Sequence, residues 1–227
     1  MGSIQSDDKE AVAFETTDLY QNIYKYVQEY MSRYDASHDF NHILRVLSLA
    51  RYILAEETKA RPTKHFDQQA VILGALLHDV GDEKYIQPGE NAEQLVSALL
   101  SKNGCPPKDV AKIALMVENV SYTNETKRPQ LVKAHINSHP ELAIVQDADR
   151  LDAIGAVGIG RVFAFGAAKA PDRGLQGSID HFDEKLLRLE SMMKTGTGKR
   201  LARERTDRLK MFYQWWQDET ALVVKSP

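Results

Sequence analysis

Apolar residues recur along most of this chain three or four positions apart, the spacing of an amphipathic helix. Runs that alternate between apolar and polar residues, as half-buried strands do, are nearly absent. The pattern therefore predicts an all-α protein. The expected helices cover about 17–34, 39–58, 67–80, 90–102, 107–121, 140–169 with a break, 179–193 and 199–222.

Proline and glycine residues lie between these periodic segments and support the predicted boundaries, as at Pro62, Gly81 and Pro140. A chain of 227 residues fits one domain with one core. Residues 1–16 are polar and aperiodic, which predicts a disordered N-terminal segment. We expect a single non-bundle helical domain over residues 17–222, followed by a short tail at 223–227.

Four polar residues lie on the core side of three predicted helices, where an unpaired polar group is costly. His42 shares the apolar face of its helix with Val46, one turn later. His78 and Asp79 end the apolar run VILGALL, and Asp149 lies on the apolar face of the helix that contains it. Each residue alone is explained by an internal hydrogen bond or a helix cap. Together, two imidazoles and two carboxylates in one interior require neutralisation.

A divalent cation neutralises such a set with four ligands at once. Imidazole and carboxylate ligands suit a first-row metal in six-coordinate geometry, which leaves two positions for water and substrate. We expect one divalent ion at this site. Mn²⁺ is the expected ion, with Mg²⁺, Co²⁺, Ni²⁺ and Fe²⁺ as alternatives.

The order of these residues resembles the HD superfamily of metal-dependent phosphohydrolases, in which an isolated His is followed by His-Asp and then by an isolated Asp. The strings SHDFNHILRV, LLHDVGDEKY and VQDADRLDAIGAVGIGR are similar to the YpgQ and YedJ type of HD hydrolase. The resemblance covers about residues 18–220 and implies an HD-type fold of orthogonally packed helices. It also implies that His42, His78, Asp79 and Asp149 are the metal ligands. The activity it implies is hydrolysis of a small nucleotide or related phosphate, including cleavage of a nucleoside triphosphate to monophosphate and pyrophosphate.

Asp82 follows Asp79 by three residues, where many relatives with an HDxxE string have a glutamate that orients the attacking water. Here the residue is shorter, so the catalytic role is left open between Asp82 and Glu83. Gly81 is expected to turn the chain and bring both to the mouth of the site. In this scheme a metal-activated water attacks the phosphorus, and one of these carboxylates orients or deprotonates it.

The negative charge of a phosphate substrate requires nearby cations, and four residues are candidates for substrate binding. Arg45 is one turn from His42, Lys84 is beside the His-Asp string, and His38 and Arg161 are further candidates. Surface ion pairs are the alternative for the two arginines. A local structural role is the alternative for His38, whose neighbour Asp39 is placed to cap a helix.

The net charge of −3 argues against a large nucleic-acid surface, so the expected partner is a small phosphorylated molecule. No stretch approaches the roughly 20 apolar residues of a membrane span, and MGSIQSDDKE lacks the apolar core of a signal peptide. A lone cysteine, Cys105, fits a reducing compartment. We therefore expect a cytoplasmic protein without a membrane partner, and the sequence leaves a homodimer open.

Two other functions compete with this interpretation. An HD-fold di-iron oxygenase needs additional ligands, and the remaining histidines are His65, His135, His139 and His181. The segment HINSHPE at 135–141 keeps that alternative open because it lies near Asp149 in the sequence. The second alternative is a non-catalytic nucleotide-binding module with a structural metal. The two open coordination positions on a six-coordinate ion argue against it.

Overall fold

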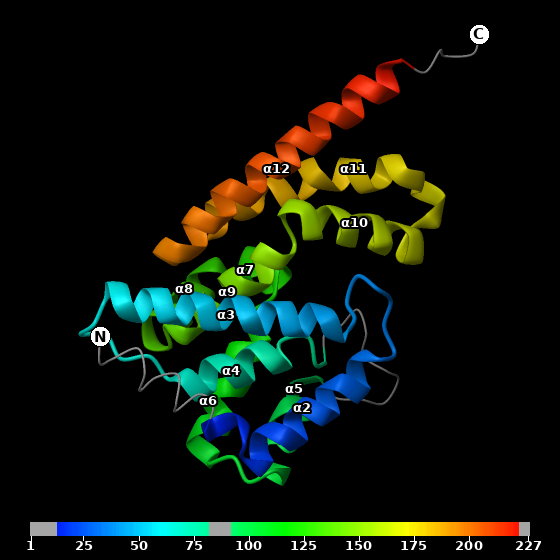
Figure 1. Ribbon diagram of the computed structural model, residues 1–227. Coiled ribbons are helices and arrows are strands. Elements are labelled where there is room, and N and C mark those ends of the chain that lie inside the picture. Colours follow the sequence, from blue (N-terminus) through cyan, green and yellow to red (C-terminus); the bar gives the residue numbers. More distant parts are fainter. Residues whose placement is uncertain (1–12, 82–91, 223–227) are drawn as a thin grey trace.

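The computed structural model describes residues 13–81 and 92–222, and every regular element among them is a helix (Figure 1). The all-α prediction is therefore confirmed. The helices are α2 (Asp18–Met31), α3 (Phe40–Ala60), α4 (Gln68–Leu77), α5 (Ala92–Lys102), α6 (Pro107–Glu118), α7 (Tyr122–Lys127), α8 (Pro129–Ser138), α9 (Glu141–Asp152), α10 (Gly155–Lys169), α11 (Gly174–Glu184) and α12 (Gly196–Ala221), with 3₁₀ turns η1 (Pro171–Arg173) and η2 (Leu186–Met192).

The sequence pattern missed α7 and α8, and it placed α11 and η2 in one helix over 179–193. The reason lies in burial, because α7 buries no side chain and α8 buries only Val132. Helices that contribute so little to the core have no apolar stripe that a periodicity analysis can detect. Residues 1–12 of the predicted disordered segment and the whole tail at 223–227 lie outside the described residues. Residues 13–16 are ordered, contrary to the prediction, because Phe14 is buried in the core beside Tyr20.

Helices α3, α4 and α9 pack against one another and form the centre of the domain (Figure 1). Every residue of α4 from Ala70 to Leu77 is buried, as expected for a helix that is apolar on all sides. Each of the three helices buries residues next to a predicted metal ligand. The core packing therefore fixes the backbone from which those ligands extend.

Side-chain caps define where the two ligand-bearing helices α3 and α4 begin. The carboxylate of Asp39 accepts a hydrogen bond from the backbone N–H of His42 at 3.1 Å, which confirms the expected cap. Asp67 accepts from the backbone N–H of Ala70 at 3.0 Å in the same way at the start of α4. The cap on α3 thus holds the first turn, and His42 with it, in a defined position.

A sharp turn at Gly155 separates α9 from α10, which confirms the break expected within 140–169. The two helices meet at 71°. Gly155 has a φ of 74°, and a Cβ there would lie 3.0 Å from Cγ of Arg205, so glycine satisfies both the backbone and the packing. Among the described residues no single helix is long and apolar enough to span a membrane, and only α9 and α10 taken together have that length and composition.

Asp147 of α9 forms hydrogen bonds with the residues that precede α12. Its buried carboxylate accepts hydrogen bonds from the backbone N–H groups of Lys194 and Thr195, at 3.0 and 2.8 Å, and from the Thr195 hydroxyl at 2.7 Å. Thr195 in turn caps α12. The contact joins two helices that are distant in the sequence.

Replacing Asp147 with alanine should therefore leave three donors without an acceptor, two of them buried, and lower the free energy of unfolding by roughly 3 kcal/mol. Chemical denaturation measured on Asp147→Ala and on Asp207→Ala provides the comparison, since Asp207 is exposed on α12. The control should change stability by no more than about 0.5 kcal/mol. Equal stability of the two variants would contradict a structural role for Asp147.

Candidate metal centre

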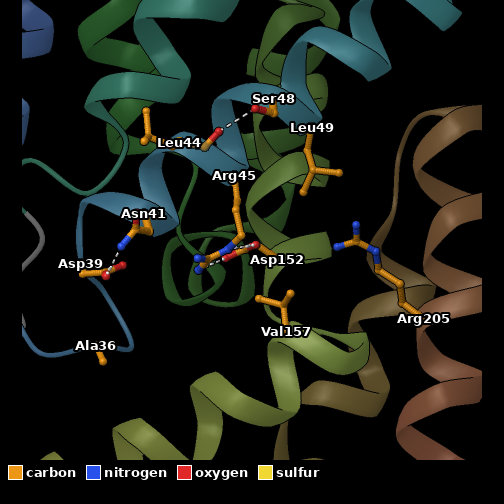
Figure 2. Close-up of a pocket in the computed structure, with 10 residues that line it drawn as sticks. All are labelled: Ala36, Asp39, Asn41, Leu44, Arg45, Ser48, Leu49, Asp152, Val157 and Arg205. Carbon is orange, nitrogen blue, oxygen red and sulfur yellow. Dashed lines mark hydrogen bonds and ion pairs between the residues drawn. The ribbon is translucent and has the colours of Figure 1, made fainter.

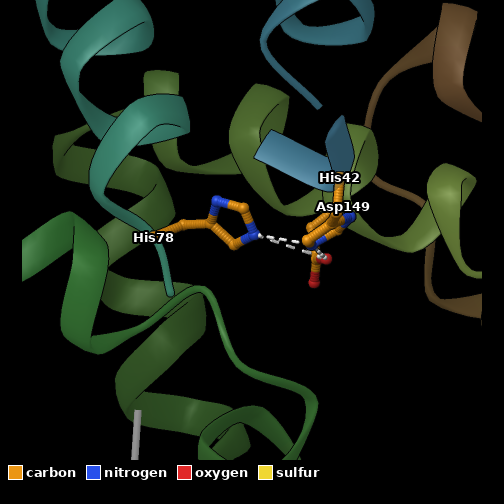
Figure 3. Close-up of side chains that lie close together, drawn as sticks. All are labelled: His42, His78 and Asp149. Atoms are coloured by element: carbon orange, nitrogen blue, oxygen red, sulfur yellow. Dashed lines mark hydrogen bonds and ion pairs between the residues drawn. The ribbon is translucent and has the colours of Figure 1, made fainter. Parts of the chain in front are cut away.

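Three segments bring His42 of α3, His78 at the end of α4 and Asp149 of α9 together (Figure 3). The two imidazole Nε2 atoms are 3.1 Å apart. Asp149 Oδ1 lies 3.6 Å from Nε2 of His42 and 3.7 Å from Nε2 of His78. One ligand atom from each of these residues lies within 4.8 Å of the others, a spacing that one metal ion can bridge.

Asp79 completes the cluster from the residue after His78. Its Oδ2 lies 3.3 Å from Nε2 of His42 and its Oδ1 lies 3.5 Å from Nε2 of His78. The Oδ2 atom is buried and has no hydrogen-bond partner within the described parts of the chain. A buried carboxylate oxygen without a partner is costly, and a cation at the centre of the cluster would supply the missing interaction.

The hydrogen bonds at the far side of each imidazole define which nitrogen carries the proton. Nδ1 of His42 donates to Oδ2 of Asp152 at 2.8 Å, and Nδ1 of His78 donates to the carbonyl oxygen of Ala75 at 2.8 Å. A carboxylate and a carbonyl oxygen only accept, so in the neutral ring each Nε2 has a lone pair. Two nitrogen lone pairs and two carboxylates thus face one another. This donor set fits a divalent cation of the first transition row.

The electrostatics of the cluster favour a positive charge at the same point. Burial of His42 opposes its protonation, yet the carboxylates of Asp152 and Asp79 outweigh burial and raise the pKa of this imidazole. Burial would raise the pKa of Asp79, but the neighbouring His78 and His42 hold it well below its ordinary value. Both shifts favour ionised carboxylates beside a positive charge, which is the arrangement that a bound metal cation would also provide.

Asp152 is the one residue of this centre that the sequence analysis did not identify. Its buried carboxylate accepts from Nδ1 of His42, from Nε and Nη2 of Arg45 at 2.8 and 3.0 Å, and lies 3.2 Å from Nη1 of Arg161. These hydrogen bonds and charges hold the pKa of Asp152 below its ordinary value despite its burial. The available signal was its position three residues after Asp149, on the same side of α9.

The four residues predicted to bind substrate differ in how they lie relative to the cluster. Arg45 and Arg161 both form an ion pair with Asp152. Surface ion pairs were the alternative for these arginines, but the Asp152 carboxylate is buried. The His38 ring centre is 5.9 Å from that of His42, at the edge of the cluster. Lys84 lies outside the described residues, and the substrate-binding role of all four stays a prediction.

Asp82 and Glu83 also lie outside the described residues, so their catalytic role stays a prediction. The preceding residue, Gly81, has a φ of 82° and donates from its N–H to the Tyr30 hydroxyl at 3.3 Å. The turn expected at Gly81 is therefore confirmed. No further histidine joins the cluster in the part of the chain that the structure describes, and no second group of three ligands forms there.

A family model described as HD domain matches residues 39–154, which include all four residues of the cluster. The chain therefore belongs to the HD domain family, as the motifs indicated. One relative is the uncharacterised protein YpgQ of Bacillus subtilis (strain 168). It is 38% identical over 170 residues, which make up 73% of this chain and 76% of YpgQ.

Solved structures share the fold over nearly the whole chain. The crystal structure of Bacillus subtilis YpgQ in complex with ADP matches with a TM-score of 0.68 and 32% identity, covering 88% of this chain and 96% of that one. A crystal structure of an HD-superfamily hydrolase from Bacillus thuringiensis matches with a TM-score of 0.62 and 26% identity, covering 89% and 96%. The expected single-domain HD fold is thus confirmed.

Proposed function

We propose that this chain is a metal-dependent phosphohydrolase that cleaves a phosphoanhydride or phosphate ester of a small nucleotide. The observation that carries the proposal is the donor set of the cluster, in which two Nε2 lone pairs and two carboxylates converge. The nucleotide class is supported by the crystal structure of the relative YpgQ, which is a complex with ADP. Hydrolysis is supported by the likeness to the Bacillus thuringiensis HD-superfamily hydrolase.

His42, His78, Asp79 and Asp149 would hold one divalent ion, with Mn²⁺ as the proposed metal. When bound, such an ion polarises a phosphoryl oxygen and lowers the pKa of a water molecule so that it attacks near neutral pH. Asp152 keeps the Nε2 lone pair of His42 directed at the ligand position by holding the proton on Nδ1. Asp82 or Glu83 would take a proton from the attacking water.

Charge on the substrate would be balanced by the four cationic candidates. His38 is next to the cluster, and Lys84, which lies outside the described residues, follows the His-Asp string in the sequence. Arg45 and Arg161 are held by Asp152, so we assign them a longer-range electrostatic role. With all four cations, the site would favour a multiply charged phosphate over a neutral substrate.

The test is a hydrolysis screen of nucleoside mono-, di- and triphosphates and simple phosphomonoesters against Mn²⁺, Mg²⁺, Co²⁺, Ni²⁺ and Fe²⁺. We expect turnover of at least one nucleotide that depends on added metal and stops on chelation. Identification of the products by phosphorus NMR separates pyrophosphate release from release of a single phosphate. Metal binding without any turnover across the panel would favour the non-catalytic module instead.

Replacing Asp82 with alanine should keep the bound metal and lower the rate by at least about tenfold, because a general base is lost while the ligands remain. Glu83→Ala is the matched variant, and the larger loss identifies the residue that acts on the water. Elemental analysis and turnover on the same preparations provide both readouts. Unchanged turnover in both variants would remove these carboxylates from the mechanism.

A further inference from the structure

A cavity lies beside the metal centre, bounded by α3, the α9–α10 turn and α12 (Figure 2). It has a volume of about 640 Å³, which is within the range of small-molecule sites. Arg45 extends into it from α3 and Arg205 from α12 (Figure 2). Leu44, Leu49 and Val157 give the cavity an apolar wall.

The two carboxylates on the cavity wall are already satisfied by protein groups. Asp39 accepts from the backbone N–H of His42 at 3.1 Å and from Nδ2 of Asn41 at 2.7 Å. Both oxygens of Asp152 are engaged by Arg45, and His42 shares one of them. Asp152 faces Arg161 as well as Arg45, so this one carboxylate lies against two guanidinium groups and cannot neutralise both.

The two arginines, in contrast, have unused donors. Arg45 bonds Asp152 through Nε and Nη2, and within the described residues its Nη1 has no partner. Arg205 donates from Nη1 to the carbonyl oxygen of Leu151, and no described carboxylate forms an ion pair with it. Burial lowers the pKa of the Arg205 guanidinium, and the charge of Asp152 offsets this effect only in part.

We propose that this cavity binds the phosphate group of a small phosphorylated ligand between Arg45 and Arg205, with the organic part of the ligand against Leu44, Leu49 and Val157. Two guanidinium groups from different helices can each donate to a tetrahedral oxyanion. The cavity shares Asp152 with the metal centre but lies on the other side of His42, whose Nε2 faces the cluster and whose Nδ1 faces Asp152. It does not depend on the proposed function.

Ser48 offers a direct test, since it is exposed, lines the cavity and lies one turn from Arg45. In Ser48→Glu the new carboxylate repels an anion and competes for Arg45, while Ser48→Gln is nearly the same size and has no charge. Binding of inorganic phosphate to the metal-loaded chain is measured by calorimetry. We expect the glutamate variant to bind phosphate at least about tenfold more weakly than the glutamine variant.

The position of the bound oxyanion separates the cavity from the metal centre, where Arg45 is also a candidate for substrate binding. Arg205→Gln should show the same loss, provided that its thermal unfolding without phosphate matches that of the unmodified chain. A crystal soaked in tungstate should place the heavy oxyanion between Arg45 and Arg205. Equal phosphate affinity in Ser48→Glu and Ser48→Gln, or tungstate bound elsewhere only, would overturn the proposal.

Discussion

Replacing His78 or Asp149 with alanine is expected to abolish metal binding and, with it, hydrolysis. Each residue supplies a ligand atom within 4.8 Å of the others, and neither has a described neighbour that could substitute for it. The rate should fall by at least about a thousandfold, since the water would lose most of its acidification. The metal content is measured by elemental analysis after gel filtration, alongside turnover of the best nucleotide from the screen.

The controls remove the same residue types from outside the centre. His181 pairs with Glu184 on α11, and Asp207 is exposed on α12, so His181→Ala and Asp207→Ala should keep both metal and activity. Thermal unfolding of all four variants shows whether a loss comes from misfolding. Full metal occupancy in His78→Ala or in Asp149→Ala would show that the ligand assignment is wrong.

The second large effect is expected from Asp152, although it contributes no ligand atom to the cluster. Asp152→Asn removes the negative charge that holds the proton on Nδ1 of His42, and an amide can donate to this nitrogen and move the proton to Nε2. Metal affinity should therefore fall by about 10- to 100-fold. Titration with Mn²⁺ followed by electron paramagnetic resonance measures the free ion directly.

The pH dependence of metal binding distinguishes this positioning role from a purely structural one. Asp152 helps to raise the pKa of His42, so in the unmodified chain a proton competes with the metal up to a higher pH. In Asp152→Asn that pKa falls, and the pH at which half of the metal affinity is lost should move to a lower value. If affinity falls without any shift in the pH profile, the tautomer argument does not hold.

The clustering of the candidate ligands was predictable because helical spacing alone placed His42, Asp79 and Asp149 on core-facing sides. The family motifs then joined them into one site. Asp152 escaped because its function depends on which residues surround it, and the contacts with His42, Arg45 and Arg161 join segments far apart in the chain. Sequence spacing predicts which face of a helix a residue lies on, but not which residue of another helix it contacts.

Helices that bury many side chains in the core were predicted from the sequence, and helices that bury few or none were not. α4, with an unbroken buried run, was expected within a few residues of its bounds, whereas α7 and α8 were missed. The cavity lined by Arg45 and Arg205 was not predicted either, because it depends on where α12 lies against the turn at Gly155. The homodimer and the cytoplasmic location stay predictions.

On the proposed ligand assignment, the convergence of candidate ligands from α3, the end of α4 and α9 would link the fold to the supply of metal. An unfolded chain cannot present this geometry, so an ion that binds only the folded chain shifts the unfolding equilibrium by mass action. At a free-ion concentration a hundred times the dissociation constant, the gain is about 2.7 kcal/mol. Metal starvation would therefore remove activity and also shorten the lifetime of the protein against proteases.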